Sequence, residues 1–379
     1  MSQPAKEQLK IALVAPYDLS VPGGVNAHIR SLASALRGLG HEAQIYGPAS
    51  QPQRLPAGEY GMGGSLPISL AGTVSGLSLN PMLDRQVRDI LRRERFDVVH
   101  IHEPMTPMLP WLFLRNARVP RVGTFHVHRE DGHRVYAAFG WFLRRLMKMV
   151  DARIAVSEAA RQTVAQYFPG EYEMLPNGVE VARFRGSTFD REVLSPGFRD
   201  ILFLGRLEGR KGVTYLLRAM PMVLRSFPDA RLVIVGDGPE RAQAEALART
   251  LSPQSVVFAG PVDDESKPAY FRSAEIFCSP ATHGESFGIV LLEAMAAGKP
   301  IVASAIEGYA GLLLRDDAGL LVPPRDPEAL ATAIIKLLSD DALRSRLGQR
   351  AAAAAQKYDW QAIAQRIEAI YRELIAARA

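Results

Sequence analysis

Short apolar runs, each followed by a longer segment with helical periodicity, recur along this chain. They fall into two series, at residues 11–15, 43–46, 98–101, 122–125 and 154–156, and then at 201–204, 232–235, 256–259, 276–279 and 301–303. Strands that alternate with helices form mainly parallel sheets covered by helices. The sequence therefore predicts an α/β protein with two similar Rossmann-like domains.

Residues that break regular structure separate the two series. Asn177-Gly178, Gly186 and Ser195-Pro196-Gly197 lie between them. After residue 327 the pattern is helical, and it ends in apolar residues at helical spacing: Trp360, Ile363, Ile367, Ile370 and Leu374. We expect one domain over residues 1–180, a second over 181–355, and a C-terminal helix over 356–379 that packs back on the first domain.

Composition excludes several classes of protein. The chain has 45 Lys and Arg against 40 Asp and Glu, and this small excess does not require a nucleic-acid partner. Cys278 is the single cysteine, so no internal disulfide can form, and its apolar neighbours favour a buried structural thiol. No uncharged apolar run approaches the roughly 18 residues of a membrane helix. We expect a cytoplasmic protein that could rest on the inner face of the cell membrane.

The segment Gly284-Glu285-Ser286-Phe287-Gly288 leads into an apolar stretch that carries Glu293. A small turn that exposes backbone before a helix is an anion site, because the first amides of a helix are unpaired and its dipole favours negative charge. A phosphorylated ligand is therefore expected here. If Glu285 and Glu293 belonged to one helix, they would lie on roughly the same side, about two turns apart. They could then hold two ends of a polar ligand, such as a sugar and a ribose.

Residues that follow the strands are the next candidates, since ligands bind beyond the carboxyl ends of parallel strands. Gly23 and Gly24 follow the first strand and could bring backbone close to a ligand, although a plain tight turn explains them as well. Two histidine-rich segments follow later strands: His100-Ile101-His102-Glu103 and Thr124-Phe125-His126-Val127-His128. They could be hydrogen-bonded structure or metal ligands. A ligand-facing His126 is favoured over a metal, because the sequence positions no carboxylate cluster beside them.

A basic turn, residues 205–212, follows the first strand of the second series. Arg206 and Lys211 could converge there on a diphosphate. A solvated basic turn is the ordinary alternative, and the position after a strand favours binding. The chain has no Asp-x-Asp motif for a metal-bound diphosphate and no P-loop motif, which disfavours a P-loop nucleotidase.

Taken together, these positions resemble the GT-B retaining glycosyltransferases of family four over essentially the whole chain. The motifs that carry the resemblance are Pro22-Gly23-Gly24-Val25, residues 100–104, residues 124–126, residues 176–179, residues 205–212, Gly236-Asp237-Gly238-Pro239 and residues 285–298. Within the family, residues 16–17, 21–25, 285–290 and 358–360 look most like those of the phosphatidylinositol mannosyltransferases. The resemblance implies two domains that face a cleft, which closes over the substrates.

The resemblance also implies roles for matching residues. The catalytic residues would be His126 at the reacting sugar, Arg206 and Lys211 on the diphosphate, and Glu285 on the sugar hydroxyls. The donor site would further include Gly24, Val262, Lys267, Ser286, Phe287, Gly288, Ile289 and Glu293. The acceptor site would include Tyr17, Gly23, Asn26 and His126. No metal ligand is implied.

The implied activity is retaining transfer of a hexosyl group, best matched by mannose from GDP-mannose, to a lipid such as phosphatidylinositol. The nucleotide sugar is a co-substrate, no cofactor is tightly bound, and a divalent cation could stimulate the reaction. The partners are the nucleotide sugar, a lipid or glycan acceptor and an anionic membrane surface, without nucleic acid. Alternatives are a UDP-sugar with another lipid or soluble acceptor, a GT-B nucleotide-sugar epimerase, and a non-catalytic module that binds sugar nucleotides.

The acceptor region departs from the mannosyltransferase pattern. Residues 55–84 contain no Lys or Arg, whereas the related enzymes use arginine near the lipid phosphate. Two basic segments follow: Arg85, Arg88, Arg92, Arg93 and Arg95, and then Arg144, Arg145 and Lys148 beside Phe139, Trp141, Phe142, Leu146 and Met147. Each segment could rest on an anionic membrane or be a solvated helix face with a buried apolar stripe.

Overall fold

A computed structural model describes residues 7–21, 23–64, 66–70, 73–77, 82–128, 134–186, 194, 197–251 and 254–378, with the backbone alone for 66–70, 73–77 and 134–135. The chain divides into two compact units. The first unit comprises Met1–Gly178 and Trp360–Ala379, and the second comprises Val179–Asp359. These divisions fall at residues 178 and 359, where the sequence placed them at 180 and 355.

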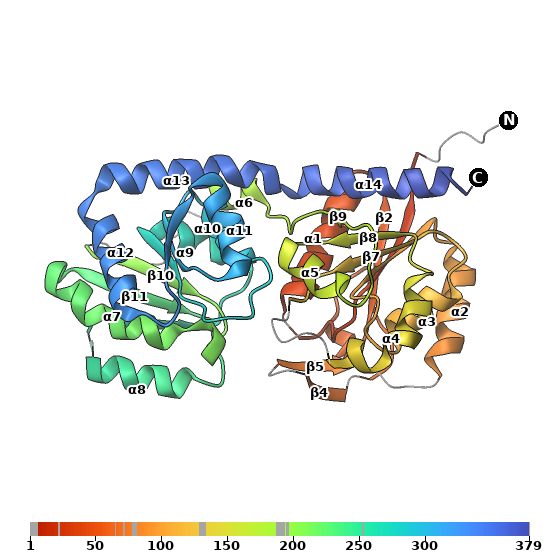
Figure 1. Cartoon of the computed structure of the whole chain (residues 1–379), viewed down its shortest axis with the longest axis horizontal. Coiled ribbons are helices and arrows are strands. Elements are labelled where there is room, and N and C mark those ends of the chain that lie inside the picture. Colours follow the sequence, from red (N-terminus) through yellow and green to blue (C-terminus); the bar gives the residue numbers. More distant parts are fainter. Residues whose placement is uncertain are drawn as a thin grey trace. The chain divides into compact units, whose positions relative to one another are not determined.

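The first unit contains a seven-stranded sheet in the order β3-β2-β1-β6-β7-β8-β9 (Figure 1). Its strands are all parallel: β1 (Lys10–Val14), β2 (Glu42–Gly47), β3 (Glu59–Gly61), β6 (Val98–His102), β7 (Arg121–Phe125), β8 (Ala152–Ala155) and β9 (Glu173–Met174). β4 (Leu66–Leu70) and β5 (Thr73–Leu77) form a separate antiparallel pair. The helices are α1 (Gly24–Gly38), a short 3-10 turn η1 (Pro52–Arg54), α2 (Leu83–Glu94), α3 (Leu109–Asn116), α4 (Arg134–Met147), α5 (Glu158–Ala165) and α14 (Trp360–Ala376).

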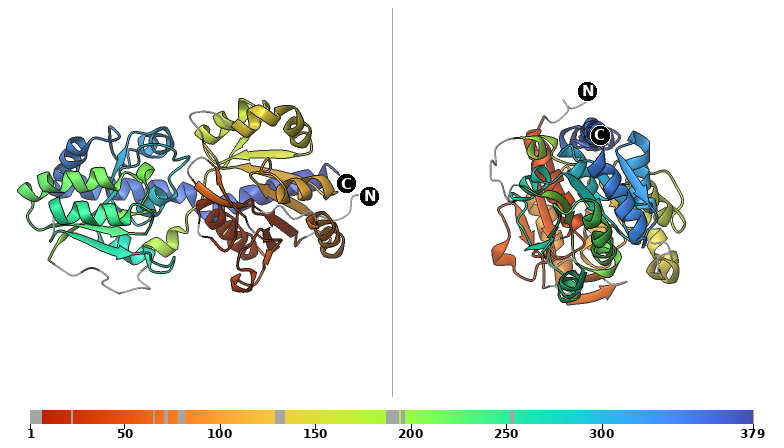
Figure 2. Two further views of the ribbon diagram at one scale, coloured as in Figure 1. Left: turned by 90° about the horizontal axis from the view of Figure 1, so that it is seen from below. Right: turned by 90° about the vertical axis from the view of Figure 1, so that its left-hand side faces the viewer.

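Helices cover both faces of this sheet (Figure 2). Successive side chains of a strand point to opposite faces. Ile11 and Leu13 of β1 accordingly pack in a core with residues of α1 and α14, whereas Ala12 and Val14 pack in a core with residues of α2, α3 and α4. Burial on both faces explains why the central strands are continuously apolar in the sequence.

The C-terminal helix α14 belongs to the first unit and lies against α1, which confirms the predicted return of the chain (Figure 1). Ile363 and Ile367 of α14 are buried in the core that it shares with α1. The Tyr371 hydroxyl lies 2.5 Å from Nδ1 of His100 on β6. The first unit is therefore completed by the last residues of the chain.

The second unit contains a six-stranded parallel sheet in the order β12-β11-β10-β13-β14-β15. Its strands are β10 (Arg199–Leu204), β11 (Ala230–Val235), β12 (Val256–Gly260), β13 (Ile276–Ser279), β14 (Ile301–Ser304) and β15 (Gly319–Val322). Its helices are α6 (Val181–Arg185), η2 (Gly209–Lys211), α7 (Val213–Ser226), α8 (Arg241–Leu251), α9 (Lys267–Ser273), α10 (Ile289–Ala296), α11 (Glu307–Asp316), α12 (Pro327–Ser339), α13 (Asp341–Ala355) and η3 (Gln356–Tyr358). The two predicted Rossmann-like domains are thus confirmed.

Two further predictions concern individual segments, and five short strands were not predicted. Cys278 on β13 is buried and free, and burial raises the pKa of its thiol, so the structural interpretation of this cysteine is confirmed. No helix in the described part of the chain is long and apolar enough to cross a membrane. The sequence did not predict β3, β4, β5, β9 or β15, which are short strands or contain Gly and Pro.

Candidate active site

The loop that joins β13 to α10 carries the glutamate that the sequence singled out. Gly284 and Gly288 adopt the left-handed conformation, with φ of 72° and 88°, and α10 begins only after Gly288. Glu285 therefore lies in the loop before the helix. The expectation that Glu285 and Glu293 share one helix is wrong, because the left-handed Gly288 interrupts helical geometry between them.

Glu285 is paired with two cations from the turn after β10. Its Oε1 atom lies 2.5 Å from Nη1 of Arg210 and 2.7 Å from Nζ of Lys211, and only 11% of its side chain is exposed. Arg210 also contacts Glu208 at 2.6 Å. Lys211 and Glu285, which the resemblance assigned to one donor site, lie together, and Arg210 is an additional cation that the sequence reasoning did not select.

Arg206 lies in the same turn without reaching Glu285 in the described contacts. Its side chain is half exposed, and its Nε atom lies 3.6 Å from Glu208. An exposed guanidinium on this turn is free to reorient toward an anion. Its predicted role on the diphosphate stays a prediction.

Close backbone packing holds this turn beside the loop. Gly212 has a φ of 70°, and a Cβ atom there would lie 2.0 Å from the carbonyl oxygen of Pro280. The amide of Thr282 donates to the carbonyl of Arg210 at 2.8 Å. The cations of one loop and the carboxylate of the other are thereby held in one place by backbone contacts.

The N-terminus of α10 adjoins this charged cluster. No side chain caps the helix at Gly288, a position at which all neighbouring residues are described. Ser286 and Ile289 are half-buried, and Phe287 packs into the core of the second unit. Amides at an uncapped helix start attract an anion. The cations and these amides together form an arrangement suited to a diphosphate.

A second charged pair lies on the side of α10 near α9. Nζ of Lys267 is 3.7 Å from Oε1 of Glu293 and 2.6 Å from Asp264. Burial raises the pKa of Glu293, and the Lys267 ammonium opposes that shift. Burial lowers the pKa of Lys267, but Glu293 and Asp264 outweigh it, so the net shift is upward. Val262 is half-buried against the core of the second unit, so the three predicted donor residues belong to one unit, with Lys267 and Glu293 in contact.

In the first unit, buried histidines cluster at the ends of β6 and β7. Nδ1 of His102 lies 2.9 Å from Nε2 of His126. The His28 ring from α1 packs edge-on against His126, with centroids 4.6 Å apart, and its Nδ1 atom lies 2.7 Å from Oδ1 of Asn177. Burial lowers the pKa of His28 to about 4 and that of His126 well below its usual 6.5, so both rings are neutral at pH 7.

Glu103 fixes the backbone around His126. It follows β6, has a φ of 49°, and its Oε1 atom accepts hydrogen bonds from the amides of His126, at 2.5 Å, and Val127, at 2.8 Å. A carboxylate that holds two successive amides makes the end of β7 rigid. Glu103 is thus a positioning residue that the sequence reasoning noted only as part of a motif.

The glycine-rich start of α1 contributes the remaining predicted residues. Gly23 and Gly24 are exposed and no described side chain caps the helix there, whereas Pro22 lies outside the described residues. The Asn26 amide nitrogen donates to the carbonyls of Asp18, at 2.7 Å, and Val21, at 3.1 Å. The Oδ1 atom of Asn26 is buried without a partner among the described residues, which marks it as an available acceptor. Tyr17 is half-buried after β1.

His28, His102 and His126 form the one group in the described ranges that could hold a metal, with one nitrogen from each within 4.8 Å of the others. Nδ1 of His102 and Nε2 of His126 are within hydrogen-bond distance of each other, and the His28 ring is turned 67° and 80° from the other two rings. Three lone pairs would have to converge on one ion. The rings instead pack as a hydrogen-bonded cluster, and the expectation of no metal stays a prediction.

Comparisons with known proteins identify the family. The model described as Glycosyltransferase Family 4 matches residues 22–183, and the model for Glycosyl transferases group 1 matches residues 186–354. A phosphatidyl-myo-inositol mannosyltransferase of Mycolicibacterium smegmatis is 39% identical over 373 residues, which are 97% of this chain and 95% of the relative. The chain belongs to the GT-B glycosyltransferases of family 4. As a glycosyltransferase it is also similar, at 29% identity over 94% of this chain and 92% of the relative, to a D-inositol 3-phosphate glycosyltransferase of Kineococcus radiotolerans.

Solved structures share the fold of this glycosyltransferase. Sucrose-phosphate synthase from Thermosynechococcus elongatus superposes with a TM-score of 0.76 at 23% identity and covers 97% of this chain and 100% of its own. The Anabaena protein HepE, in complex with UDP and glucose, has a TM-score of 0.75 at 20% identity and covers 96% of this chain and 99% of its own. The likeness supports the GT-B architecture alone.

Three residues of the glycosyltransferase could have been found from sequence signals that were not used. Arg210 is a second arginine in the turn that was already selected. His28 is a polar residue beside Ile29 on the apolar stripe of α1, and a histidine there signals a buried polar partner. That partner, Asn177, stands in a motif that was read as a break in regular structure and as part of the family resemblance, with no role given to its side chain.

Proposed function

We propose that this glycosyltransferase moves a mannosyl group from GDP-mannose to phosphatidylinositol, or a closely related lipid, on the cytoplasmic face of the membrane. The observation that carries the proposal is the paired cluster of Arg210, Lys211 and Glu285 at the start of α10. It occurs in a chain that is 39% identical, along nearly its whole length, to a phosphatidyl-myo-inositol mannosyltransferase.

Departure of the nucleoside diphosphate is the step that needs most help from the protein. Negative charge grows on the leaving phosphate as the bond to the sugar breaks. Lys211, with Arg206 or Arg210, would neutralise that charge, and the amides of residues 286–289 would donate to the phosphate oxygens. Glu285 would bind sugar hydroxyls while holding Lys211 in place at 2.7 Å. Glu293 would bind the ribose.

His126 is suited to contact the sugar, where positive charge develops, and not the departing diphosphate. The sugar carbon acquires oxocarbenium-like positive charge in transfer reactions of this kind. Burial, followed by the charges of nearby histidines, keeps the pKa of His126 well below 6.5, so its ring is neutral at pH 7 and does not repel this charge. Its backbone, fixed by Glu103, could also present a carbonyl. We assign no protein nucleophile, in keeping with retention by departure and attack on one face.

The test is a panel of GDP- and UDP-sugars incubated with lipid extracts and with soluble inositol phosphates, with release of nucleoside diphosphate and labelled product measured. Labelled lipid from GDP-mannose supports the proposal. Labelled product from a soluble inositol phosphate would instead indicate a soluble acceptor, as in the name of the Kineococcus relative. Conversion of donor without an acceptor would indicate an epimerase, and binding without turnover a non-catalytic module.

Variants test the site itself. Lys211→Ala and Glu285→Ala should each lower kcat by about 100-fold or more, the usual cost of removing one group that stabilises developing charge. Lys336→Ala is the matched control, since Lys336 is an exposed lysine on α12 of the same unit. Activity near that of the wild type in both site variants would refute the assigned donor site.

A further inference from the structure

Helix α4 exposes large aromatic side chains to solvent. Trp141 is 71% exposed and Phe139 is 56% exposed, an unusual state for residues of this size. Phe142 packs edge-on between Trp141 and Trp111 of α3, with centroids 6.0 and 5.4 Å away. The aromatic surface is therefore continuous from α4 to α3.

Three exposed cations lie at the C-terminal end of this helix and in the turn that follows it, and none has an ion-pair partner among the described residues: Arg144, Arg145 and Lys148. Residues 134–150 contain no Asp or Glu at all. The other basic segment, on α2, differs in this respect. Arg88 pairs with Asp84 at 2.5 Å and Arg92 with Asp89 at 2.5 Å. The charge of α2 is largely neutralised within the helix, whereas that of α4 is available to an external anion.

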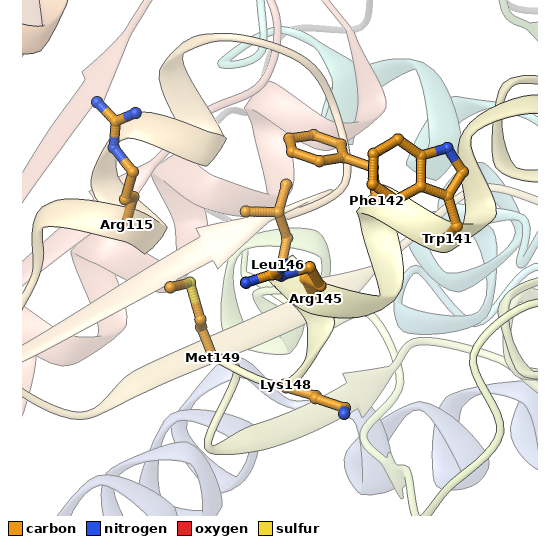
Figure 3. A pocket seen from close by; sticks show the side chains of 7 residues that line it. All are labelled: Arg115, Trp141, Phe142, Arg145, Leu146, Lys148 and Met149. Atoms are coloured by element: carbon orange, nitrogen blue, oxygen red, sulfur yellow. The ribbon is translucent and has the colours of Figure 1, made fainter.

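A groove with a volume of 830 Å³ lies beside these residues and is lined by Arg115, Trp141, Phe142, Arg145, Leu146, Lys148 and Met149. Its size falls within the range of about 300–1,000 Å³ typical of ligand clefts. In Figure 3, Phe142, Leu146 and Met149 form its apolar wall, with Arg115 at one end and Arg145 and Lys148 along one side. Arg115 is held by Asp84 at 2.6 Å. An apolar trough with cationic margins is complementary to a phospholipid, which joins an anionic phosphate to apolar chains.

We propose that the surface formed by Phe139, Trp141, Arg144, Arg145 and Lys148 docks this protein on a membrane that contains anionic phospholipid. Trp141 and Phe139 enter the interface between head groups and chains, where aromatic rings are favoured. The three cations contact lipid phosphates, and the groove takes an apolar segment of one lipid. This surface is separate from the residues assigned to sugar transfer, and it extends the proposed function by naming how a lipid acceptor is reached.

The experiment measures binding of the full-length protein to vesicles of phosphatidylcholine alone and of phosphatidylcholine with 30% phosphatidylglycerol (roughly the anionic content of a charged leaflet). We expect binding to the anionic vesicles that weakens as salt is raised, since a screened surface attracts cations less. The triple variant Arg144→Ala/Arg145→Ala/Lys148→Ala should lower the partition coefficient roughly 100-fold, at about fivefold for each cation. Trp141→Ala should lower it as well and should remove the binding that persists at high salt.

The matched control is Arg85→Ala/Arg88→Ala/Arg92→Ala on α2, which removes the same number of positive charges. It should change vesicle binding by less than about threefold, because those arginines are already paired. Equal losses in the two triple variants would overturn the proposal, since binding would then depend on net charge alone. Failure of the wild type to bind anionic vesicles would overturn it too. The proposal would also be overturned if Trp141→Ala changed only the self-association of the protein, measured by sedimentation, and left vesicle binding unchanged.

A second measurement separates this proposal from the proposed function. Transfer to a short-chain, monomeric phosphatidylinositol needs the sugar-transfer site but no docking surface. The α4 variants should retain that activity and lose activity on vesicles. If the wild type transfers sugar to neither acceptor yet binds anionic vesicles, the proposed function fails and the docking surface stands.

Discussion

Acidification should destabilise the first unit selectively. Burial lowers the pKa of His28 to about 4 and that of His100 to about 3, with the charge of His28 adding to the effect on His100. In the unfolded chain both titrate near 6.5. Folding lowers the pKa of each histidine, so its contribution to stability is fully present above pH 6.5. This contribution is lost as the pH falls from 6.5 toward the pKa of the folded state, because in that range the unfolded chain binds a proton that the folded chain does not.

The size of the effect follows from these values. At pH 5 the unfolded state has bound most of its protons and the folded state almost none, and the difference amounts to about 2 kcal/mol for each of His28 and His100. Their sum, about 4 kcal/mol, is a large part of the stability of a typical domain. His102 and His126 shift in the same direction and add to the loss. Glu94 does not contribute, since its pKa of about 2 places its window below pH 4.5.

Tryptophan fluorescence reports this unit alone. The sequence has three tryptophans, Trp111, Trp141 and Trp360, and all belong to the first unit. Urea unfolding followed by their emission at pH 7 and pH 5 should show a midpoint lower by at least roughly 2 M at pH 5, for a slope of about 2 kcal/mol per M. His28→Gln should shrink this pH difference by about 1 M, the share of one histidine. His283→Gln, an exposed histidine of the second unit, should leave it unchanged. Equal midpoints at the two pH values would refute the reasoning.

Three other substitutions test separate parts of the structure. Gly308→Ala would place a Cβ atom 1.8 Å from the carbonyl oxygen of Glu285, so the loop that carries Glu285 must shift. We expect kcat/KM for the donor to fall about 100-fold in initial-rate assays while the second unit stays folded, and an unchanged rate would contradict the placement of that loop. Tyr371→Phe removes the hydroxyl that lies 2.5 Å from the buried ring of His100, and it should lower the unfolding free energy of the first unit by about 1–3 kcal/mol. The urea midpoint at pH 7 measures this change, and an unchanged midpoint would mean that the hydrogen bond contributes no net stability. Glu293→Gln should raise the donor KM by about tenfold with little change in kcat, because a group that binds substrate and transition state equally affects binding alone. A loss confined to kcat would contradict the assignment of Glu293 to donor binding.

The central strands could be predicted because burial on both faces leaves them apolar without interruption. β1 and β10 are examples: neighbouring residues of each strand contribute to two different cores. Short strands at sheet edges, such as β3 and β9, carry too few residues for a pattern and depend on the partner strand that they meet. The central strands can therefore be predicted from the apolar pattern of the sequence, whereas the strands at the sheet edges are determined by pairing with neighbouring strands in the folded protein.

The candidate site was predictable in kind and less so in detail. The resemblance to family four implied that Arg206, Lys211 and Glu285 belong to one donor site, and Lys211 and Glu285 lie 2.7 Å apart, although Glu285 lies in the loop before α10 and not in a helix with Glu293. Whether Arg206 or Arg210 joins them depends on how the η2 turn directs its side chains, which sequence spacing does not encode. The start of α10 depends similarly on the left-handed Gly288, where a Cβ atom would lie 2.8 Å from the Tyr309 ring, so that only glycine fits without a shift.

Completion of the first unit by α14 has a consequence for biosynthesis. A chain emerges from the ribosome from its N-terminus, and domains usually fold in that order. Here α1 covers only part of the core that carries Ile11 and Leu13, and this core is incomplete until Ile363 and Ile367 have been synthesised, whereas residues 179–359 form a continuous unit that can close earlier. A prematurely terminated polypeptide that lacks the last twenty residues would keep an uncovered apolar surface, and chaperones and proteases would recognise it as unfinished.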